Sequence, residues 1–214
     1  MRVRISIALG ALLAGGLQAQ KTINPLAQTG LSGSPGGQTT ILGNSTVGYT
    51  EALQEIRWTE YADQPCLLTI TTGYFYGSPN PYRPELKICD WPRRSGSGLF
   101  PSVKELGSTT EEVASWKTVK FANNPRYFIR GVAVCKSSKD NNRIKGIRIY
   151  PAKVWTSPRA IDVINDPDEA SRTNCGTWDA PAFCPANYIA VQLMVYHRPH
   201  QITGLGLTCR QIEY

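Results

Sequence analysis

The sequence predicts an all-β domain that is stabilised by disulfides and has only short helical turns. Short runs of alternating aliphatic and polar residues recur along the chain, and prolines and Asn/Gly/Asp clusters separate them. Six cysteines follow a leader-like N-terminus, and an even number is typical of disulfides in an exported chain. The short intervals between these turn residues favour a sandwich, a barrel or a prism. Strand pairs of similar sequence also recur.

Residues 1–19 have the layout of a signal peptide. Arg2 and Arg4 form a basic start, residues 5–17 are apolar, and a small-residue cleavage site ends at Ala19. The alternatives, an uncleaved membrane helix or a buried core helix, fit this length less well. We therefore expect a mature chain from Gln20 onward that is secreted, periplasmic or otherwise extracellular, without a transmembrane anchor after cleavage.

The charge of the mature chain favours loose attraction to anionic partners. Without Arg2 and Arg4 the chain has 21 basic and 16 acidic residues, a net charge of +5. The excess is spread out, and its densest cluster, residues 136–148, also contains Asp140. This pattern is typical of a solvated basic surface, to which acidic glycans or phospholipid headgroups are attracted. A nucleic-acid partner is not expected, because such proteins concentrate their charge on one element.

The mature chain divides into a lead-in and one domain. Residues 20–48 are rich in Gly, Ser, Thr and Gln, which predicts a flexible lead-in or an edge strand with glycine turns. Residues 49–214 are expected to form a single β domain with two to three internal repeats. Only two segments have helical character within it: residues 108–117, and residues 159–172, which Pro167 interrupts.

Two parts of the chain share a pattern of paired strands. Residues 127–134 and 187–194 are aromatic-led strands that follow an Asn- and Pro-containing turn. Residues 143–150 and 201–208 then share the pattern Ile-x-Gly-aliphatic-x-aliphatic. Chance similarity between two amphipathic hairpins is the alternative, because short apolar alternation recurs in all β proteins.

Further features accompany the repeat. Trp116 and Trp178 precede the two copies at a similar distance, and a weaker third copy would run over residues 58–89. Three glycines of the clear copies are expected at strand positions: Gly131, Gly146 and Gly204.

These repeats resemble the three-fold β-prism architecture of the vitelline membrane outer layer protein family and, more distantly, of jacalin-like lectins. The best match covers residues 175–212, where Trp178, the Cys184-Pro185 turn and a strand closed by Cys209 resemble one family repeat. The resemblance implies a β-prism-like domain. The sequence lacks the acidic Gly-Asp-Asp-Thr-Ala-Leu type of turn of the vitelline proteins and the terminal glycine-aspartate sugar loop of the lectins.

The same resemblance implies how the cysteines pair. Each repeat would close its own strand pair with a disulfide, and the two remaining cysteines would join. The implied pairs are Cys184–Cys209, Cys66–Cys89 and Cys135–Cys175. A bond between Cys175 and Cys184 is the main competitor, since short loops close readily.

An aromatic turn over residues 74–82 is the most function-like segment. Aromatic rings beside an amide are what a sugar-binding loop needs, because sugar C–H faces stack on rings while hydroxyls take hydrogen bonds. The alternative is a turn that covers one end of the core, stiffened by its prolines. The candidate binding residues are Tyr74, Tyr76, Asn80 and Tyr82.

No catalytic residue, metal site or cofactor is predicted. His197 and His200 share one turn around a proline, which suits a hairpin turn better than a metal site. The acidic residues between 162 and 169 lack the glycine and distal glutamate of a calcium loop, which favours a solvated turn. No glycine-flanked serine nucleophile accompanies the histidines.

The sequence therefore favours an exported, non-enzymatic β protein that binds glycan or another envelope or extracellular component. An architectural or assembly protein of the envelope is the first alternative, and a secreted hydrolase with an unrecognised site is the second. The sequence does not predict the oligomeric state.

Overall fold

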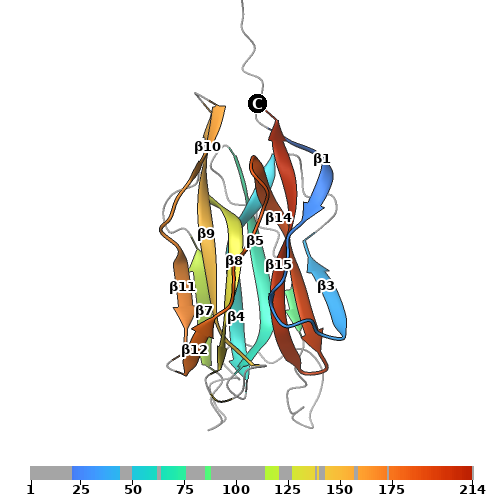
Figure 1. Cartoon of the computed structure of the whole chain (residues 1–214), viewed down its shortest axis with the longest axis vertical. Helices are drawn as coiled ribbons and strands as arrows, with labels where there is room; N and C mark the ends of the chain where they lie inside the picture. Colours follow the sequence, from blue (N-terminus) through green and yellow to red (C-terminus); the bar gives the residue numbers. More distant parts are fainter. Residues whose placement is uncertain are drawn as a thin grey trace, which may run out of the picture.

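The computed structural model describes residues 21–43, 50–61, 64–75, 85–87, 114–120, 127–137, 139, 143–156, 159–172 and 174–213. Within these ranges every regular element is a β-strand, and the strands run roughly along the long axis of the molecule (Figure 1). They form three antiparallel sheets, called A, B and C here. The predicted all-β fold class is therefore confirmed.

Each sheet is built around a pair of long antiparallel strands. In sheet B these are β4 (Glu51–Tyr61) and β5 (Gln64–Tyr74), in sheet C β8 (Tyr127–Ser137) and β9 (Ile144–Thr156), and in sheet A β14 (Tyr188–Arg198) and β15 (Gln201–Glu213). The second and third pairs contain the two clear copies of the sequence repeat. The weak third copy over residues 58–89 is out of step with the first pair, because it begins inside β4 and ends at the edge strand that pairs with β5.

Shorter strands line both edges of each pair. In sheet B, β6 (Glu85–Lys87) pairs with β5, and β7 (Ala114–Lys120) pairs with β4. Both edges of sheet C are split in two. There β10 (Arg159–Val163) and β11 (Asp168–Ser171) pair with β9, whereas β12 (Cys175–Trp178) and β13 (Ala182–Phe183) pair with β8.

Sheet A takes its edges from the start of the described chain. β1 (Lys21–Gln28) and β2 (Ser32–Gly33) pair with β15, and β3 (Gln38–Leu42) pairs with β14. The blue strands β1 and β3 accordingly lie beside the red strands β14 and β15 (Figure 1). Sheets B and C have the same order along the chain. The two long strands come first, the edge strands that pair with the second long strand follow, and those that pair with the first long strand come last. Sheet A repeats these pairings, but its edge strands come from the start of the described chain and its long strands from the end.

The three glycines of the repeat lie on strands, as predicted. Gly131 lies on β8, Gly146 on β9 and Gly204 on β15. Gly146 and Gly204 each face the short edge strand, where Gly146 pairs with Ser171 and Gly204 with Gly33. A Cβ at Gly146 would lie 2.7 Å from Ser171 Cβ, so the absence of a side chain lets the edge strand approach.

Two predicted helical segments are strands instead. Residues 114–117 belong to β7, while residues 108–113 lie outside the described part of the chain. Residues 159–172 contain β10 and β11, and Pro167 lies in the gap between them. Both of these strands pair with β9, so tertiary hydrogen bonding overrides a local composition that favours a helix turn.

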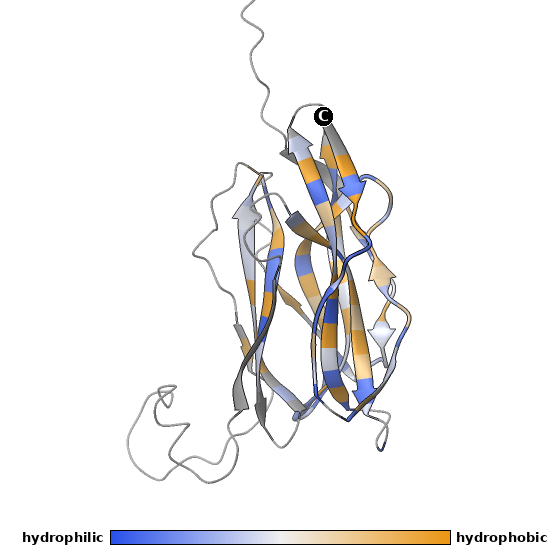
Figure 2. Ribbon diagram, turned by 90° about the vertical axis from the view of Figure 1, so that its left-hand side faces the viewer, coloured by the Kyte–Doolittle hydropathy of each residue, from blue (hydrophilic) through white to orange (hydrophobic). Residues whose placement is uncertain are grey.

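The interior between the sheets is filled by aliphatic side chains from all three. Ile56 on β4, Val134 on β8 and Leu205 on β15 belong to one buried cluster. Hydrophobic and hydrophilic residues alternate along the long strands, as expected where only one face of a sheet is buried (Figure 2). Ser32 ties two sheets together there, because its Oγ accepts a hydrogen bond of 3.1 Å from the Val134 amide.

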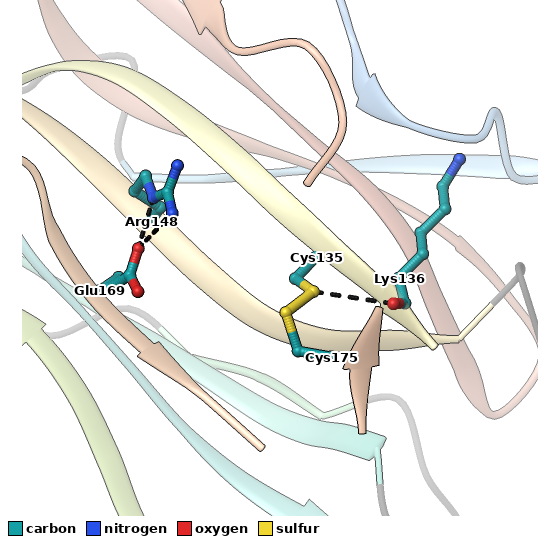
Figure 3. Close-up of a disulfide and its surroundings, with 5 residues drawn as sticks. All are labelled: Cys135, Lys136, Arg148, Glu169 and Cys175. Carbon is teal, nitrogen blue, oxygen red and sulfur yellow. Dashed lines mark hydrogen bonds and ion pairs between the residues drawn. A yellow bond between two sulfur atoms is a disulfide. The ribbon is translucent and has the colours of Figure 1, made fainter. Parts of the chain in front are cut away.

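Two of the three implied disulfides are present. Cys135–Cys175 joins β8 to β12 within sheet C (Figure 3), and Cys184–Cys209 joins the segment after β13 to β15 in sheet A. The competing Cys175–Cys184 bond is therefore wrong. Cys89 and the side chain of Cys66 lie outside the described residues, so their pairing stays a prediction.

In the described part of the chain, no helix is long and apolar enough to cross a membrane.

Replacing Gly204 with Ala should lower the free energy of unfolding by about 1 to 3 kcal/mol, the usual cost of overpacking. The new Cβ would lie 2.5 Å from Leu31 Cδ1 and 2.9 Å from the Ser32 carbonyl oxygen, which is backbone and cannot rotate away. Gly37→Ala is the matched control, because nothing lies within 4 Å of a Cβ at that position. Urea titration of both variants measures the difference, and equal stabilities would contradict the assigned packing of β2 on β15.

Candidate functional site

The predicted aromatic turn is described only at its first residues. Tyr74 ends β5 and lies opposite Glu51, the first residue of β4. Tyr76, Asn80 and Tyr82 lie outside the described residues. Glu51 is only 8% exposed, and its carboxylate accepts a hydrogen bond of 3.0 Å from Thr72 Oγ1. The negative charge of Glu51, burial and a hydrogen bond between the two side chains raise the pKa of the Tyr74 hydroxyl above its usual 10.0.

The residue after Tyr74 belongs to the core. Phe75 is buried, and its ring packs edge-on against Phe128 of sheet C at a centroid distance of 5.1 Å. Gln54 of β4 reaches the same region, since its Nε2 donates to the Tyr127 carbonyl oxygen at 3.4 Å. The first residue of the turn is therefore fixed by sheet B, and the next one packs on sheet C.

A separate hollow lies on the outer face of sheet C. It has a volume of about 440 Å³ and opens where the edge of the sheet is broken between β10 and β11. Eight residues line it: Arg130, Tyr150, Pro151, Val163, Ile164, Asn165, Pro167 and Phe183. Its volume lies within the usual range for sites that bind small molecules.

Two aromatic rings and one cation form the wall of the hollow. Tyr150 of β9 meets Phe183 of β13 edge-to-face, with ring centroids 4.9 Å apart. The Arg130 guanidinium carbon lies 5.4 Å from the Phe183 centroid, within the range of a cation–π contact. Gly131 lies beneath Phe183, and any side chain at that position would collide with the ring. Phe183 is nevertheless 40% exposed, and Val163 is 53% exposed, so the hollow presents apolar surface to solvent.

A second cation on this face, Arg148, forms an ion pair with Glu169. Nε and Nη2 of Arg148 each lie 2.5 Å from Glu169 Oε2 on β11 (Figure 3). The Arg148 guanidinium also lies 4.1 Å from the Trp178 ring centroid. Burial lowers the pKa of Arg148, but hydrogen bonds and charge from Tyr150 and Glu169 outweigh it and raise the pKa overall. Arg148 thus stays charged and links Trp178 to Tyr150 of the hollow.

A third group of rings lies farther along β9. Lys153 Nζ is 3.5 Å from the Trp155 ring centroid and 5.9 Å from that of Tyr127. The indole nitrogen of Trp155 donates to Asp162, which lies opposite Lys153 on β10. Both Asp162 and Glu169 of the predicted solvated turn therefore lie on strands and bind cationic or aromatic side chains, which corrects that expectation.

The histidine turn forms as predicted. Pro199 and His200 connect β14 to β15, and His200 has a φ of 65°, which matches the second central residue of a type II turn. His197 Nε2 lies 2.9 Å from Thr40 Oγ1 of β3, so this imidazole has a structural partner. No group of three or more His, Cys, Asp or Glu side chains among the described residues is placed to hold a metal ion.

The hollow was missed by the sequence-based prediction. Its aromatic and cationic residues come from β8, β9 and β13, which are far apart in the sequence. One signal was available: Arg148 and Tyr150 alternate with the buried Ile147 and Ile149, so both side chains had to point outward.

The fold resembles solved lectins. The agglutinin of Calystegia sepium matches with a TM-score of 0.50 and 10% identity over 88% of this chain and 99% of that chain. A mannose-specific jacalin-related lectin from Morus nigra, solved with mannose, has a TM-score of 0.46 and 14% identity over 89% and 95% of the two chains. Frutapin, a lectin from Artocarpus incisa, has a TM-score of 0.45 and 13% identity over 89% and 97%.

Neither a protein-family model nor a curated protein matches the sequence. At 10% identity, the likeness to the Calystegia agglutinin shows the fold alone. Together with the three sheets and their shared connectivity, it establishes that this chain has the β-prism fold of jacalin-related lectins.

Replacing Tyr74 with Phe should make stability less sensitive to alkaline pH. Because the Tyr74 pKa is raised in the folded protein, the folded state binds more protons than the unfolded state above about pH 10, and stability falls there. The Phe variant lacks this contribution, so its free energy of unfolding should decline less steeply as the pH rises. Glu51→Gln should flatten the curve similarly, because it removes the charge. Parallel curves for all three proteins would refute the coupling.

Proposed function

We propose that this chain is an exported, non-enzymatic β-prism protein that binds glycan through the hollow on the outer face of sheet C. One observation carries the proposal: the Phe183 and Tyr150 rings form the wall of a solvent-open hollow beside a cation and an amide. Rings offer stacking surface for sugar C–H groups, and Asn165 and Arg130 offer hydrogen bonds to hydroxyls.

The chemistry of the lining supports binding rather than hydrolysis. None of the eight lining residues is a serine, cysteine, histidine or carboxylic acid. A glycosidase needs two carboxyl groups beside the scissile bond, and a serine or cysteine hydrolase needs a nucleophile with a base. A surface of rings, one amide and one guanidinium can hold and orient a sugar without reacting with it. The fold shared with lectins is consistent with this proposal.

The aromatic turn remains a second proposed glycan contact, formed by Tyr74, Tyr76, Asn80 and Tyr82. At Tyr74 the hydroxyl is engaged by Glu51, so any sugar would stack on the ring rather than bind the hydroxyl. Sheets B and C meet near this turn through Phe75 and Phe128. The turn and the hollow can be tested as separate sites.

Export remains part of the proposal and rests on the leader-like residues 1–19. Expressed with its leader in a secreting host, the protein should be recovered outside the cytoplasm with Gln20 at its N-terminus. N-terminal sequencing of the recovered chain measures this, and an intact Met1 terminus would refute cleavage.

Replacing Phe183 with Ala should weaken glycan binding about five-fold or more, because a stacking contact is worth roughly 1 kcal/mol beyond area burial. A glycan array of the wild-type protein first identifies a bound oligosaccharide, whose affinity is then measured by calorimetry. Ile41→Ala is the matched control, since Ile41 is an exposed apolar residue, 46% accessible, on β3 of sheet A.

The control variant should bind like the wild type. Equal affinities for the wild-type protein and the Phe183 variant would remove the hollow as the site. In that case Tyr74→Ala, measured with the same oligosaccharide, tests whether the aromatic turn binds instead. An array on which no glycan binds would overturn the proposed function itself.

A further inference from the structure

We propose that the hollow selects acidic glycans, with Arg130 binding the carboxylate or sulfate group of a sugar unit that stacks against Phe183. This inference rests on the proposed function, because it names the class of glycan that the same site would take. Three observations carry it: the position of Arg130, the absence of an acidic partner among the described residues, and the contact of its guanidinium with the Phe183 ring.

The backbone fixes where Arg130 lies. The register between β8 and β9 shifts at this residue, with Ile129 opposite Pro151 and Gly131 opposite Tyr150, so Arg130 is the extra residue of a bulge. Its carbonyl oxygen accepts a hydrogen bond of 2.8 Å from the Cys184 amide. Since Cys184 is bonded to Cys209 of sheet A, the backbone beneath the Arg130 side chain is tied to two sheets.

Arg130 differs from the other cations on this face by its partners. Arg148 binds Glu169 at 2.5 Å, and Lys136 Nζ binds Asp179 Oδ2 at 2.7 Å. Lys153 lies across from Asp162. Among the described residues, no acidic side chain lies within ion-pair distance of Arg130, whose side-chain partner is the Phe183 ring. No described residue therefore neutralises the charge of the hollow.

The contact with the Phe183 ring leaves the N–H donors of the Arg130 guanidinium available to an anion. A cation–π contact uses the face of the planar guanidinium, while its N–H donors lie along the edge and match two oxygens of a carboxylate or sulfate. Arg130 is half-buried, and its charge acts more strongly there than in open water. Asp166 and Asp168 flank the lining residue Pro167, but neither of them lines the hollow.

Matched oligosaccharides test the inference. Wild-type protein is titrated with three probes that share one backbone: a neutral oligosaccharide, its uronic-acid form and its sulfated form. Arg130→Gln is compared with Arg198→Gln, a variant of equal charge change at an exposed residue at the end of β14, on sheet A. Arg130→Lys keeps the charge but not the planar pair of donors. Thermal unfolding of each variant verifies that it is folded.

The wild type should prefer at least one acidic probe over the neutral one. Arg130→Gln should reduce affinity for that probe roughly ten-fold, as expected for a charge-assisted hydrogen bond. Its affinity for the neutral probe should fall by a smaller factor, because the glutamine amide can still donate a hydrogen bond to a hydroxyl. Arg198→Gln should bind like the wild type, and Arg130→Lys should fall between. Whichever acidic probe binds identifies the group as carboxylate or sulfate.

Two other results have distinct meanings. Equal affinity for neutral and acidic probes, or equal losses in the Gln variants at 130 and 198, would overturn the acidic selectivity while leaving glycan binding intact. Failure of every probe and of the wider array would overturn the proposed function and this inference with it. If Arg130→Gln is unfolded, the wild-type preference and the Arg130→Lys variant decide the question.

Discussion

The pairing of the first described strands with the last ones in sheet A is the constraint on which the rest of the structure depends. β15 finds partners in β1 and β2, and β14 finds one in β3, so the last long pair is completed only by the first described strands. Without them, both long strands would present unpaired edges, which soluble β proteins avoid. The Ser32 hydroxyl and the close approach at Gly204 then fix these edge strands against sheets C and A.

Sheet A also positions the candidate site. The Arg130 carbonyl oxygen binds the Cys184 amide, and Cys184 is joined by a disulfide to Cys209 of sheet A. Both edges of sheet C are split into two short strands, as is the edge on β15 in sheet A. The break after Val163 leaves room for the hollow, and the short β13 brings Phe183 over Gly131. The short, split edges of sheet C therefore produce the site, while its long strand pair supplies the rigid base.

The long strands could be predicted because aliphatic alternation encodes them locally, as in residues 143–150 and 201–208. The short edge strands could not, since β10 and β11 exist through pairing with β9 and not through their own composition. The Cys184–Cys209 bond followed from a family resemblance, whereas the hollow depends on residues from three separated strands, including Phe183. The alternation of Arg148 and Tyr150 with buried isoleucines indicated a polar and aromatic outer face, but not which other strands contribute residues to it.

The central claim is that a β-prism protein binds glycan on the outer face of one sheet. The most direct measurement is an NMR titration of isotope-labelled mature protein with an oligosaccharide selected on the array. The account predicts that the strongest chemical-shift changes fall on Arg130, Tyr150, Asn165 and Phe183, whose side chains line the hollow. Changes centred instead on the β14–β15 turn at His200, with sheet C unaffected, would contradict it.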